Sequence, residues 1–238
     1  MSENNTAKTR KTVGILGGMG PEATADLFLK IIKATPATKD QEHLRIIVDN
    51  NPAIPDRTAH IFGQGEDPTT LMTQGAQVLE RAGADLIVIP CNTAHYFRER
   101  VAKAVNIPIL HIMEETAKYV TEKHPGVRTV GLLASTGTYK VGLYETAFRS
   151  FGIEVLIPDD RDAQMVMRAI YDVKSGRYDE PHNTMVEVGE RLVSRGAGVV
   201  IGGCTEVPIV LKNGDLSVPV VDPTQCLAMA AVREALKG

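Results

Sequence analysis

Leu86-Ile-Val-Ile-Pro-Cys91-Asn-Thr-Ala-His95 is an apolar run that stops abruptly at a cysteine followed by small polar residues. Gly198-Val-Val-Ile-Gly-Gly-Cys204-Thr-Glu206 repeats this design far downstream in the chain. Short, nearly continuous apolar runs are typical of strands that are buried on both faces of a parallel sheet. The sequence therefore predicts a thiol and then a hydroxyl at the end of each of two buried strands.

Two further pairs of landmarks recur in the same order around these strands. Val13-Gly-Ile-Leu-Gly-Gly-Met-Gly20 is echoed by Val130-Gly-Leu-Leu-Ala-Ser-Thr-Gly137, and Ile107-Pro-Ile-Leu-His111 is echoed by Val218-Pro-Val-Val-Asp222. Strands that alternate with amphipathic helices predict parallel sheets covered by helices. We therefore expect two similar α/β domains that face each other about a pseudo-two-fold axis.

The predicted domain boundaries follow this repeat. Residues 12–113 form the first domain, 114–216 form the second, and 1–11 form a polar tail that we expect to be disordered. The C-terminal helix within 217–238 is assigned to the first domain, because the chain starts there and termini often lie close together. A chain of 238 residues is long enough to bury one large core or two smaller ones.

Composition and charge exclude several classes of protein. The chain is 43% hydrophobic and 23% charged, as soluble globular proteins are. A formal net charge of -3 without a Lys/Arg cluster argues against nucleic-acid binding. The apolar runs are too short to cross a bilayer, and the polar N-terminus lacks the apolar core of a signal peptide. We therefore expect a cytoplasmic protein with no nucleic-acid or membrane partner.

The three cysteines match neither a disulfide framework nor a zinc-binding pattern. Cysteine is among the most buried residue types, so each one alone is first interpreted as a small core residue. We keep that interpretation for Cys226. Cys91 and Cys204 differ from it, because a core cysteine has no reason to reappear at the same landmark of both halves.

Two loops carry candidate ligand-binding groups. The glycines from Gly17 to Gly20, followed by Pro21, predict a tight turn into a helix whose first backbone amides can approach an anion. This turn lacks the spacing of a dinucleotide fingerprint and the lysine of a P-loop. The loop over 49–58 contains Arg57, a candidate carboxylate clamp at the ligand-binding edge of an α/β sheet. On these residues alone, a solvated loop arginine is the favoured interpretation of Arg57.

Two thiols on opposite sides of a cleft between domains suit the inversion of a carbon centre. One thiolate takes the α-proton of an amino acid from one face, while the opposite thiol delivers a proton to the other face. A free cysteine has a pKa of about 8.5 and is only slightly ionised at neutral pH, so its neighbours must assist. Glu206, His95 and the backbone amides that follow each cysteine are the candidate assistants, with a structural role favoured for His95.

Three stretches carry a specific resemblance: Gly17-Gly-Met-Gly-Pro-Glu-Ala-Thr24, Pro90-Cys-Asn-Thr-Ala-His95 and Gly202-Gly-Cys-Thr-Glu-Val-Pro208. They are similar to the motifs of the aspartate/glutamate racemase family, most of all to its aspartate racemase branch, and the match runs over nearly the whole chain from Val13. The resemblance implies two Rossmann-like (flavodoxin-like) domains. It also implies racemisation by two cysteines without pyridoxal phosphate (PLP) or any other cofactor, and a homodimer.

Carried over residue by residue, the resemblance implies a complete site. Cys91 and Cys204 are its acid/base pair. Arg57 and Lys174 bind the side-chain carboxylate of an acidic amino acid, since a buried anion without partners would be too costly. This role reverses the interpretation of Arg57 given above. Asn92, Thr93 and Thr205 hold the α-carboxylate and the amino group, and the backbone near Met19 lines the site. Glu206, next to the second Cys-Thr pair, completes the set of substrate-binding residues.

Several alternatives stay open at this point. Similar glutamate racemases carry histidine where this chain has Glu206, which favours the aspartate branch without excluding glutamate or broad-specificity racemases. Hydantoin racemase, arylmalonate decarboxylase and maleate isomerase vary the cysteines or the cations on the same scaffold. A two-lobed amino-acid binding module needs the cleft but not two thiols. A PLP-dependent racemase would need a phosphate-binding context around Lys174, which the sequence lacks.

Overall fold

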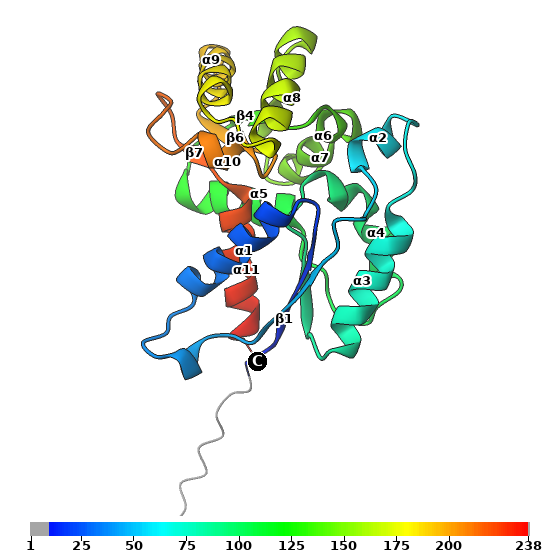
Figure 1. Cartoon of the computed structure of the whole chain (residues 1–238). Helices are drawn as coiled ribbons and strands as arrows, with labels where there is room; N and C mark the ends of the chain where they lie inside the picture. The colour runs from blue at the N-terminus through cyan, green and yellow to red at the C-terminus, as the bar shows by residue number, and fades with distance from the viewer. Residues whose placement is uncertain (1–9, 238) are drawn as a thin grey trace, which may run out of the picture.

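The first sheet consists of three parallel strands. β1 (Val13–Gly17) lies between β2 (Ile46–Asn50) and β3 (Leu86–Val88), and Ile109 adds a parallel bridge to Ile87 beyond β3. All residues of β1 and β3 are buried, as expected for strands covered on both faces. The computed structural model describes residues 10–237 (Figure 1), so most of the tail predicted over 1–11 lies outside the described residues.

The second sheet repeats the order of the first. β4 (Thr129–Leu133) lies between β5 (Glu154–Leu156) and β6 (Val199–Gly202), and β7 (Val220–Val221) pairs with β6 on its other side. All of these pairings are parallel. The repeated order confirms the prediction of two similar parallel α/β sheets. It also makes β3 and β6, the strands that precede the two cysteines, equivalent members of the two sheets.

A central layer of helices is shared by the two sheets. α1 (Pro21–Ala34) packs against α11 (Pro223–Ala235), which packs in turn against α5 (Ile112–Lys123) (Figure 1). One hydrophobic cluster joins these helices to the inward faces of β1, β3, β4 and β6. The C-terminal helix returns to the start of the chain, where the Lys11 N–H donates to the Ala235 carbonyl oxygen at 3.0 Å.

The outer face of each sheet has its own cover. α3 (Thr69–Arg81) packs over the first sheet, and α8 (Asp160–Lys174) and α9 (Asp179–Ser194) cover the second, each above a separate hydrophobic cluster. The remaining elements are short helices: η1 (Asp40–Glu42), α2 (Arg57–Ile61), η2 (Thr93–Phe97), α4 (Arg98–Ala102), α6 (Thr136–Val141), α7 (Leu143–Arg149) and α10 (Val207–Val210).

The segment after the first cysteine forms the 3₁₀ turn η2 followed by α4, where its sequence alone suggests one helix over 92–104. The His95 N–H donates to the Asn92 carbonyl oxygen at 3.0 Å, and the Cys91 carbonyl oxygen is occupied by His95 Nδ1 at 2.9 Å. Because a side chain takes the carbonyl that would begin an α-helical ladder, the chain forms a tight turn directly after the first cysteine.

Gly18 makes the turn from β1 into α1. Its φ is +91°, and a Cβ atom there would lie 2.3 Å from the backbone of Asn51, so only glycine fits. Thr24 Oγ1 accepts from the Gly18 N–H at 2.9 Å and donates to the Gly20 carbonyl oxygen at 2.9 Å. This turn places Met19 at the edge of the sheet where the first cysteine emerges.

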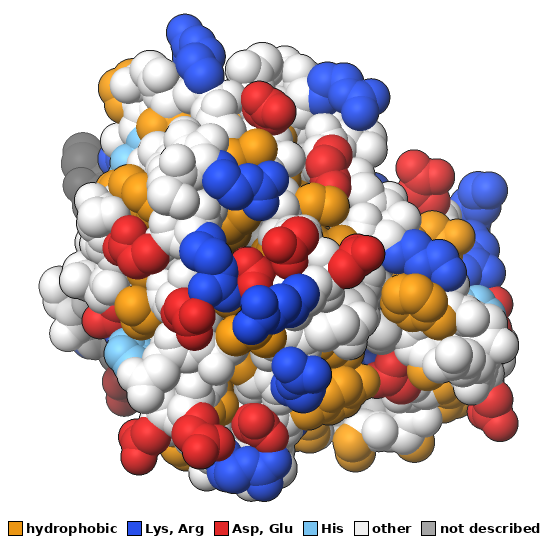
Figure 2. Space-filling view, turned by 90° about the horizontal axis from the view of Figure 1, so that it is seen from above, with side chains coloured by type: hydrophobic (Ala, Val, Ile, Leu, Met, Phe, Trp, Pro, Cys, Tyr) orange, Lys and Arg blue, Asp and Glu red, His pale blue; other side chains and the backbone are white. Residues whose placement is uncertain are grey.

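The surface seen from above carries both signs of charge. Lys and Arg side chains alternate with Asp and Glu side chains over this face (Figure 2), which includes the ends of α8 and α9. Within residues 10–237, no helix combines the length and the apolar character needed to cross a membrane.

Candidate active site

One cavity, of about 40 Å³, lies at the carboxyl ends of the strands in both sheets. It brings together all the residues that the sequence singles out as catalytic or substrate-binding: Met19, Arg57, Asn92, Thr93, Lys174, Thr205 and Glu206 with the two thiols of Cys91 and Cys204. Six further residues complete its wall: Asp56, Thr58, Ser135, Met167, Ile170 and Tyr171. Because carboxyl ends of parallel strands share one edge of a sheet, residues remote in sequence meet here.

The two thiols approach the cavity from equivalent positions. Cys91 follows β3 and is buried, whereas Cys204 follows β6 and is partly exposed. The Sγ atom of Cys204 donates to Glu206 Oε2 at 2.9 Å. Burial, reinforced by the negative charge of Glu206, raises the pKa of the Cys204 thiol well above its ordinary value. The structure therefore holds Cys204 as a neutral thiol.

Glu206 joins this thiol to a cation. Its Oε1 atom accepts from Lys174 Nζ at 2.6 Å, while Oε2 also accepts from Thr205 Oγ1 at 3.1 Å. Burial opposes the charge of Glu206, but the Lys174 ammonium and the hydrogen bonds from Cys204 and Lys174 outweigh it and lower the pKa of this carboxyl. Burial likewise opposes the charge of Lys174, whose pKa is raised because Cys204 and Glu206 lie beside it.

Arg57 is held against the cavity wall by backbone carbonyl groups. Its Nη1 atom donates to Ile54 at 3.1 Å and to Pro55 at 2.9 Å, and Nη2 donates to the Met19 carbonyl oxygen at 3.2 Å. Its Nε atom is buried and has no hydrogen-bond partner among residues 10–237. Since a buried donor without an acceptor is costly, Arg57 Nε is free to donate to an acceptor on a ligand.

Asn92 presents a second donor of this kind. Its Oδ1 atom accepts from the Tyr144 hydroxyl at 2.7 Å, which fixes the amide, and its Nδ2 atom is buried without a partner in the described part of the chain. Two unused buried donors, on Asn92 and Arg57, thus belong to residues of one cavity wall. Carboxylate oxygens are the acceptors that best satisfy such donors.

Hydroxyl groups connect the two halves beside the thiols. Thr93 Oγ1 shares hydrogen bonds with Ser135 Oγ at 2.9 Å and with Thr138 Oγ1 at 3.0 Å. Sequence reasoning missed Ser135, Thr138 and Tyr144. Ser135 could have been found, since it lies in the second copy of the glycine-turn landmark, two residues before Gly137. Tyr144, which lies on α7, gives no such signal.

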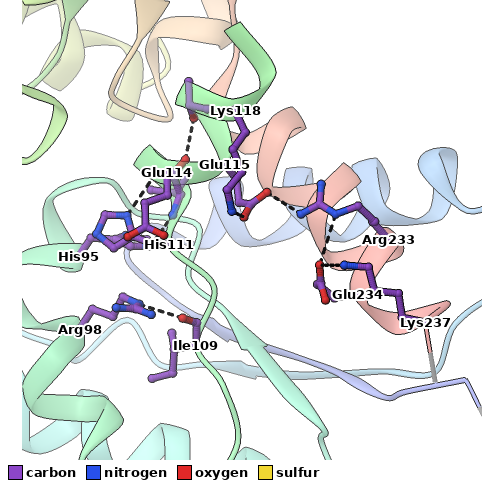
Figure 3. Close-up of polar contacts among 12 residues, drawn as sticks. His95, Arg98, Ile109, His111, Glu114, Glu115, Lys118, Arg233, Glu234 and Lys237 are labelled. Atoms are coloured by element: carbon purple, nitrogen blue, oxygen red, sulfur yellow. Dashed lines mark hydrogen bonds and ion pairs between the residues drawn. The ribbon is translucent and has the colours of Figure 1, made fainter. Parts of the chain in front are cut away.

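His95 does not approach either thiol with a free ring nitrogen. Its Nε2 atom accepts from the Ile112 N–H at 3.2 Å, so its Nδ1 atom carries the proton and donates to the Cys91 carbonyl oxygen. The ring lies beside His111 in a separate cavity of about 450 Å³ (Figure 3). Burial, followed by the neighbouring His111, lowers the pKa of His95 to about 3. His95 therefore links η2 to α5, and the alternative of a proton relay is wrong.

This buried neutral imidazole predicts a loss of stability in acid. The unfolded chain protonates His95 below its ordinary pKa of 6.5, whereas the folded protein does so only near a pKa of about 3, so stability falls as the pH drops through this window. Between pH 7 and pH 5 the contribution of this residue is roughly 2 kcal/mol. In His95→Asn, whose amide can still donate to Cys91, the fall in unfolding free energy should shrink by that amount. Equal pH dependence of urea unfolding in both proteins would contradict this account.

Cys226 lies apart from the cavity. It is buried in α11 within the central hydrophobic cluster, and burial, followed by the charge of Asp222, raises the pKa of its thiol. A buried thiol with a raised pKa is a poor nucleophile and a poor base. These surroundings support its interpretation as a core residue.

Comparison with known proteins adds to this geometry. The pattern of the Asp/Glu/Hydantoin racemase family matches residues 16–231. The broad specificity amino-acid racemase RacX of Bacillus subtilis is 30% identical over 226 residues, which cover 92% of this chain and 96% of RacX. A glutamate racemase of Aquifex pyrophilus is 27% identical over 162 residues, covering 65% of this chain and 60% of its own length.

Solved structures extend the similarity to three dimensions. The aspartate racemase of Picrophilus torridus superposes with a TM-score of 0.84 at 32% identity, and the match covers 94% of each chain. An aspartate racemase homologue from Pyrococcus horikoshii superposes with a TM-score of 0.78 at 28% identity, covering 95% of this chain and 99% of its own. The chain therefore belongs to the Asp/Glu/Hydantoin racemase family, as the resemblance of its motifs implies.

Proposed function

We propose that this protein is a cofactor-independent amino-acid racemase that inverts the α-carbon of an acidic amino acid, with aspartate as the favoured substrate. The observation that carries the proposal is that Cys91 and Cys204, at the ends of equivalent strands, line one cavity together with Arg57 and Lys174. Two cations suit a substrate with a second carboxylate, because a buried anion needs charged or hydrogen-bonding partners.

The proposed reaction is a proton exchange between two faces of one carbon. The thiolate of one cysteine removes the α-proton, and the electron pair of the broken C–H bond is delocalised into the α-carboxylate. The thiol of the other cysteine then delivers its proton to the opposite face. The first cysteine ends as a thiol and the second as a thiolate, so the roles are exchanged in the reverse reaction.

The unused donors of the cavity support this chemistry. Asn92 Nδ2, which has no partner among the described residues, donates to the α-carboxylate, where negative charge grows as the α-proton leaves. Arg57 Nε and Lys174 Nζ hold the distal carboxylate. For Asn92 Nδ2 and Arg57 Nε, the assignment gives a buried donor the anionic acceptor that it lacks.

The cleft must widen to admit such a substrate. A cavity needs about 10–15 Å³ of accessible space to hold one water molecule, so the cavity of about 40 Å³ has room for only a few atoms and is too small for an amino acid. Thr58 of α2 closes one side, and it packs so tightly against α6 that a Cβ atom on Gly137 would lie 2.7 Å from its hydroxyl. We infer that α2 moves away from α6 when substrate enters.

The second candidate is a broad-specificity amino-acid racemase, which the similarity to RacX over most of both chains favours. Glutamate is a further substrate that fits two cations. A comparison of aspartate, glutamate and neutral amino acids in one assay separates these options. Retained binding without turnover of any of them would instead support a two-lobed binding module.

The proposal predicts isotope incorporation during turnover. Purified protein freed of metal and PLP, incubated with L-aspartate in deuterated water, should yield D-aspartate that carries deuterium at the α-carbon. Chiral chromatography with mass spectrometry measures both features, because a two-base mechanism takes the new proton from a solvent-exchanged thiol. Absence of α-exchange with every amino acid tested would overturn the proposal.

A cytoplasmic homodimer stays a prediction that follows from the sequence and the resemblance. An exposed apolar surface supports the assembly: Leu29 of α1 and Val48 of the edge strand β2 are 52% and 42% exposed and lie beside Phe28. Exposed apolar residues clustered on an unpaired strand edge commonly mark a protein interface. Sedimentation equilibrium is the measurement that tests the homodimer.

A further inference from the structure

The carboxylate of Glu206 stands between two groups that compete for its negative charge. Oε1 accepts from Lys174 Nζ at 2.6 Å, and Oε2 accepts from Cys204 Sγ at 2.9 Å. The residue is only 6% exposed, so water does little to screen either interaction. Loss of the Lys174 contact at Oε1 therefore changes the basicity of the carboxylate that the Cys204 thiol contacts at Oε2.

Lys174 is also a group that the substrate needs. It lies at the end of α8 and lines the cavity with Arg57, the other cation assigned to the distal carboxylate. An ammonium group is a compact charge on a flexible stem, so it can turn from one carboxylate to another. A dicarboxylic substrate thus brings a second anion to a cation that already holds Glu206.

We propose that the Lys174–Glu206 pair is a switch set by the substrate: the distal carboxylate draws Lys174 away from Glu206, and the released carboxylate then accepts the proton of Cys204. This inference rests on the proposed racemase function. It makes the side chain of the substrate a trigger for thiolate formation as well as a handle for binding.

Every proton and electron pair that moves in the switch is accounted for. The S–H bond of Cys204 breaks, its electron pair stays on sulfur, and an O–H bond forms at Glu206 Oε2. The Cys204 thiolate takes the α-proton and becomes a thiol again, while Cys91 gives its proton to the opposite face. The catalytic cycle ends with protonated Glu206 and a Cys91 thiolate. Glu206 then loses its proton to solvent and the Cys91 thiolate gains one, which restores the starting state.

Electrostatics favour this order of events. In the closed cavity Lys174 helps to lower the pKa of Glu206, which makes the carboxylate a weak base for the thiol. When Lys174 turns to the substrate, that stabilisation is lost and Glu206 becomes a stronger base. The other titratable groups of the cavity wall come from α2, from the loop after β3 and from α8: Asp56, Arg57, Cys91 and Tyr171. None of them is hydrogen-bonded to Glu206 within residues 10–237.

The consequence is a form of selectivity that appears in kcat. A neutral amino acid such as alanine leaves Lys174 on Glu206, so Cys204 stays protonated even when the cavity is occupied. A simple clamp would instead discriminate through binding and raise KM for the neutral substrate. The two descriptions differ in which kinetic constant changes.

Supplying the substrate in two pieces tests the switch. Alanine and formate together present the same groups as aspartate, but only formate carries the distal carboxylate. Saturating formate should accelerate α-deuterium exchange of bound alanine about tenfold or more, the effect of roughly one charge-assisted hydrogen bond, for the enantiomer whose α-proton faces Cys204. The effect should vanish in Lys174→Met and in Glu206→Gln. Equal stimulation in Glu206→Gln would show that formate only fills space and would overturn the switch.

The pH profile for aspartate gives an independent reading. The acid limb of kcat/KM reports the free enzyme, in which Lys174 holds the pKa of Glu206 low, and the acid limb of kcat reports the complex, in which that pKa has risen. Activity needs the carboxylate form, so the acid limb of kcat should lie at higher pH. The two limbs should come together in Lys174→Met. Coincident limbs in the wild-type protein would contradict the switch.

The outcomes separate this inference from the function on which it rests. Absence of α-exchange with every amino acid removes the racemase itself. Exchange of aspartate with no response of alanine to formate, and with coincident acid limbs, leaves the racemase and removes only the switch.

Discussion

Replacement of Cys91 or of Cys204 by serine should abolish inversion of aspartate in both directions. Each inversion needs one group to remove a proton and another to supply one, and a serine hydroxyl is far too weak an acid to replace a thiol. General acid–base groups contribute about 10²–10⁴-fold each, so a loss of at least this size is expected in kcat. Chiral chromatography of D- and L-aspartate measures it, with circular dichroism to verify folding.

The two variants should also differ from each other. The remaining thiol still faces one side of the α-carbon, so any residual deuterium exchange without inversion should be confined to one enantiomer. Cys91→Ser and Cys204→Ser should retain it for opposite enantiomers. Residual exchange of the same enantiomer in both variants would contradict the placement of the thiols on two faces.

Cys226→Ser is the matched control for both. This thiol lies in the central hydrophobic cluster of α11, away from the cavity. Its replacement should cost some stability, because a hydroxyl is buried among apolar side chains, while kcat stays close to that of the wild-type protein. A loss of inversion equal to that of the other variants, in a folded protein, would show that the third thiol has been misassigned.

Replacement of Arg57 by alanine should lower kcat/KM for aspartate by about 10- to 150-fold, equivalent to roughly 1.5–3 kcal/mol for one charged hydrogen bond. The loss should be much smaller for alanine as a substrate, since alanine has no distal carboxylate. The kcat/KM of Arg57→Lys for aspartate should fall between those of the wild-type protein and Arg57→Ala. The lysine keeps the charge but lacks the planar guanidinium that the carbonyl groups of Ile54, Pro55 and Met19 hold. Steady-state kinetics on both substrates measure the ratio.

A purely structural role of Arg57 would give a different result. Release of three backbone carbonyl groups disturbs the loop before α2, and such a disturbance lowers kcat/KM for aspartate and alanine by the same factor. Arg98→Ala is the comparison variant, since Arg98 Nε also donates to a carbonyl oxygen, that of Ile109, at 2.8 Å (Figure 3) but lies outside the cavity. It should leave the aspartate-to-alanine ratio unchanged. An unchanged ratio in Arg57→Ala would remove the clamp.

Much of the fold could be predicted because local pattern decides it. Continuous apolar runs mark β1, β3, β4 and β6, and their burial on both faces is what such runs require. Strand limits are less accessible: the run Leu44-Arg-Ile-Ile-Val48 suggests a strand over 44–48, whereas β2 is Ile46–Asn50, because its pairing with β1 begins where Ile46 aligns with Val13. Register with a partner strand is not encoded in the apolar pattern alone.

The residues of the candidate site were accessible to sequence reasoning through their positions. Cys91 and Cys204 follow equivalent strands, so chain order and hydrophobic period place each thiol at the carboxyl edge of its own sheet. The packing of the two sheets then brings these two edges to one cavity. The motifs that resemble the racemase family supplied the remaining residues. The catalytic roles of all of them stay predictions, for which the isotope and substitution experiments are the tests.

The sequence by itself determined the repeated architecture and the edge at which the two thiols emerge, because hydrophobic periodicity and chain order are local properties. Only the tertiary structure decided which side chains touch. It set Lys174 on Glu206 and Glu206 on Cys204, and it turned the ring of His95 away from the cavity towards Ile112. These contacts join elements far apart in the chain, and their geometry depends on how the helices pack on the sheets. This packing geometry cannot be predicted from a pattern of neighbouring residues.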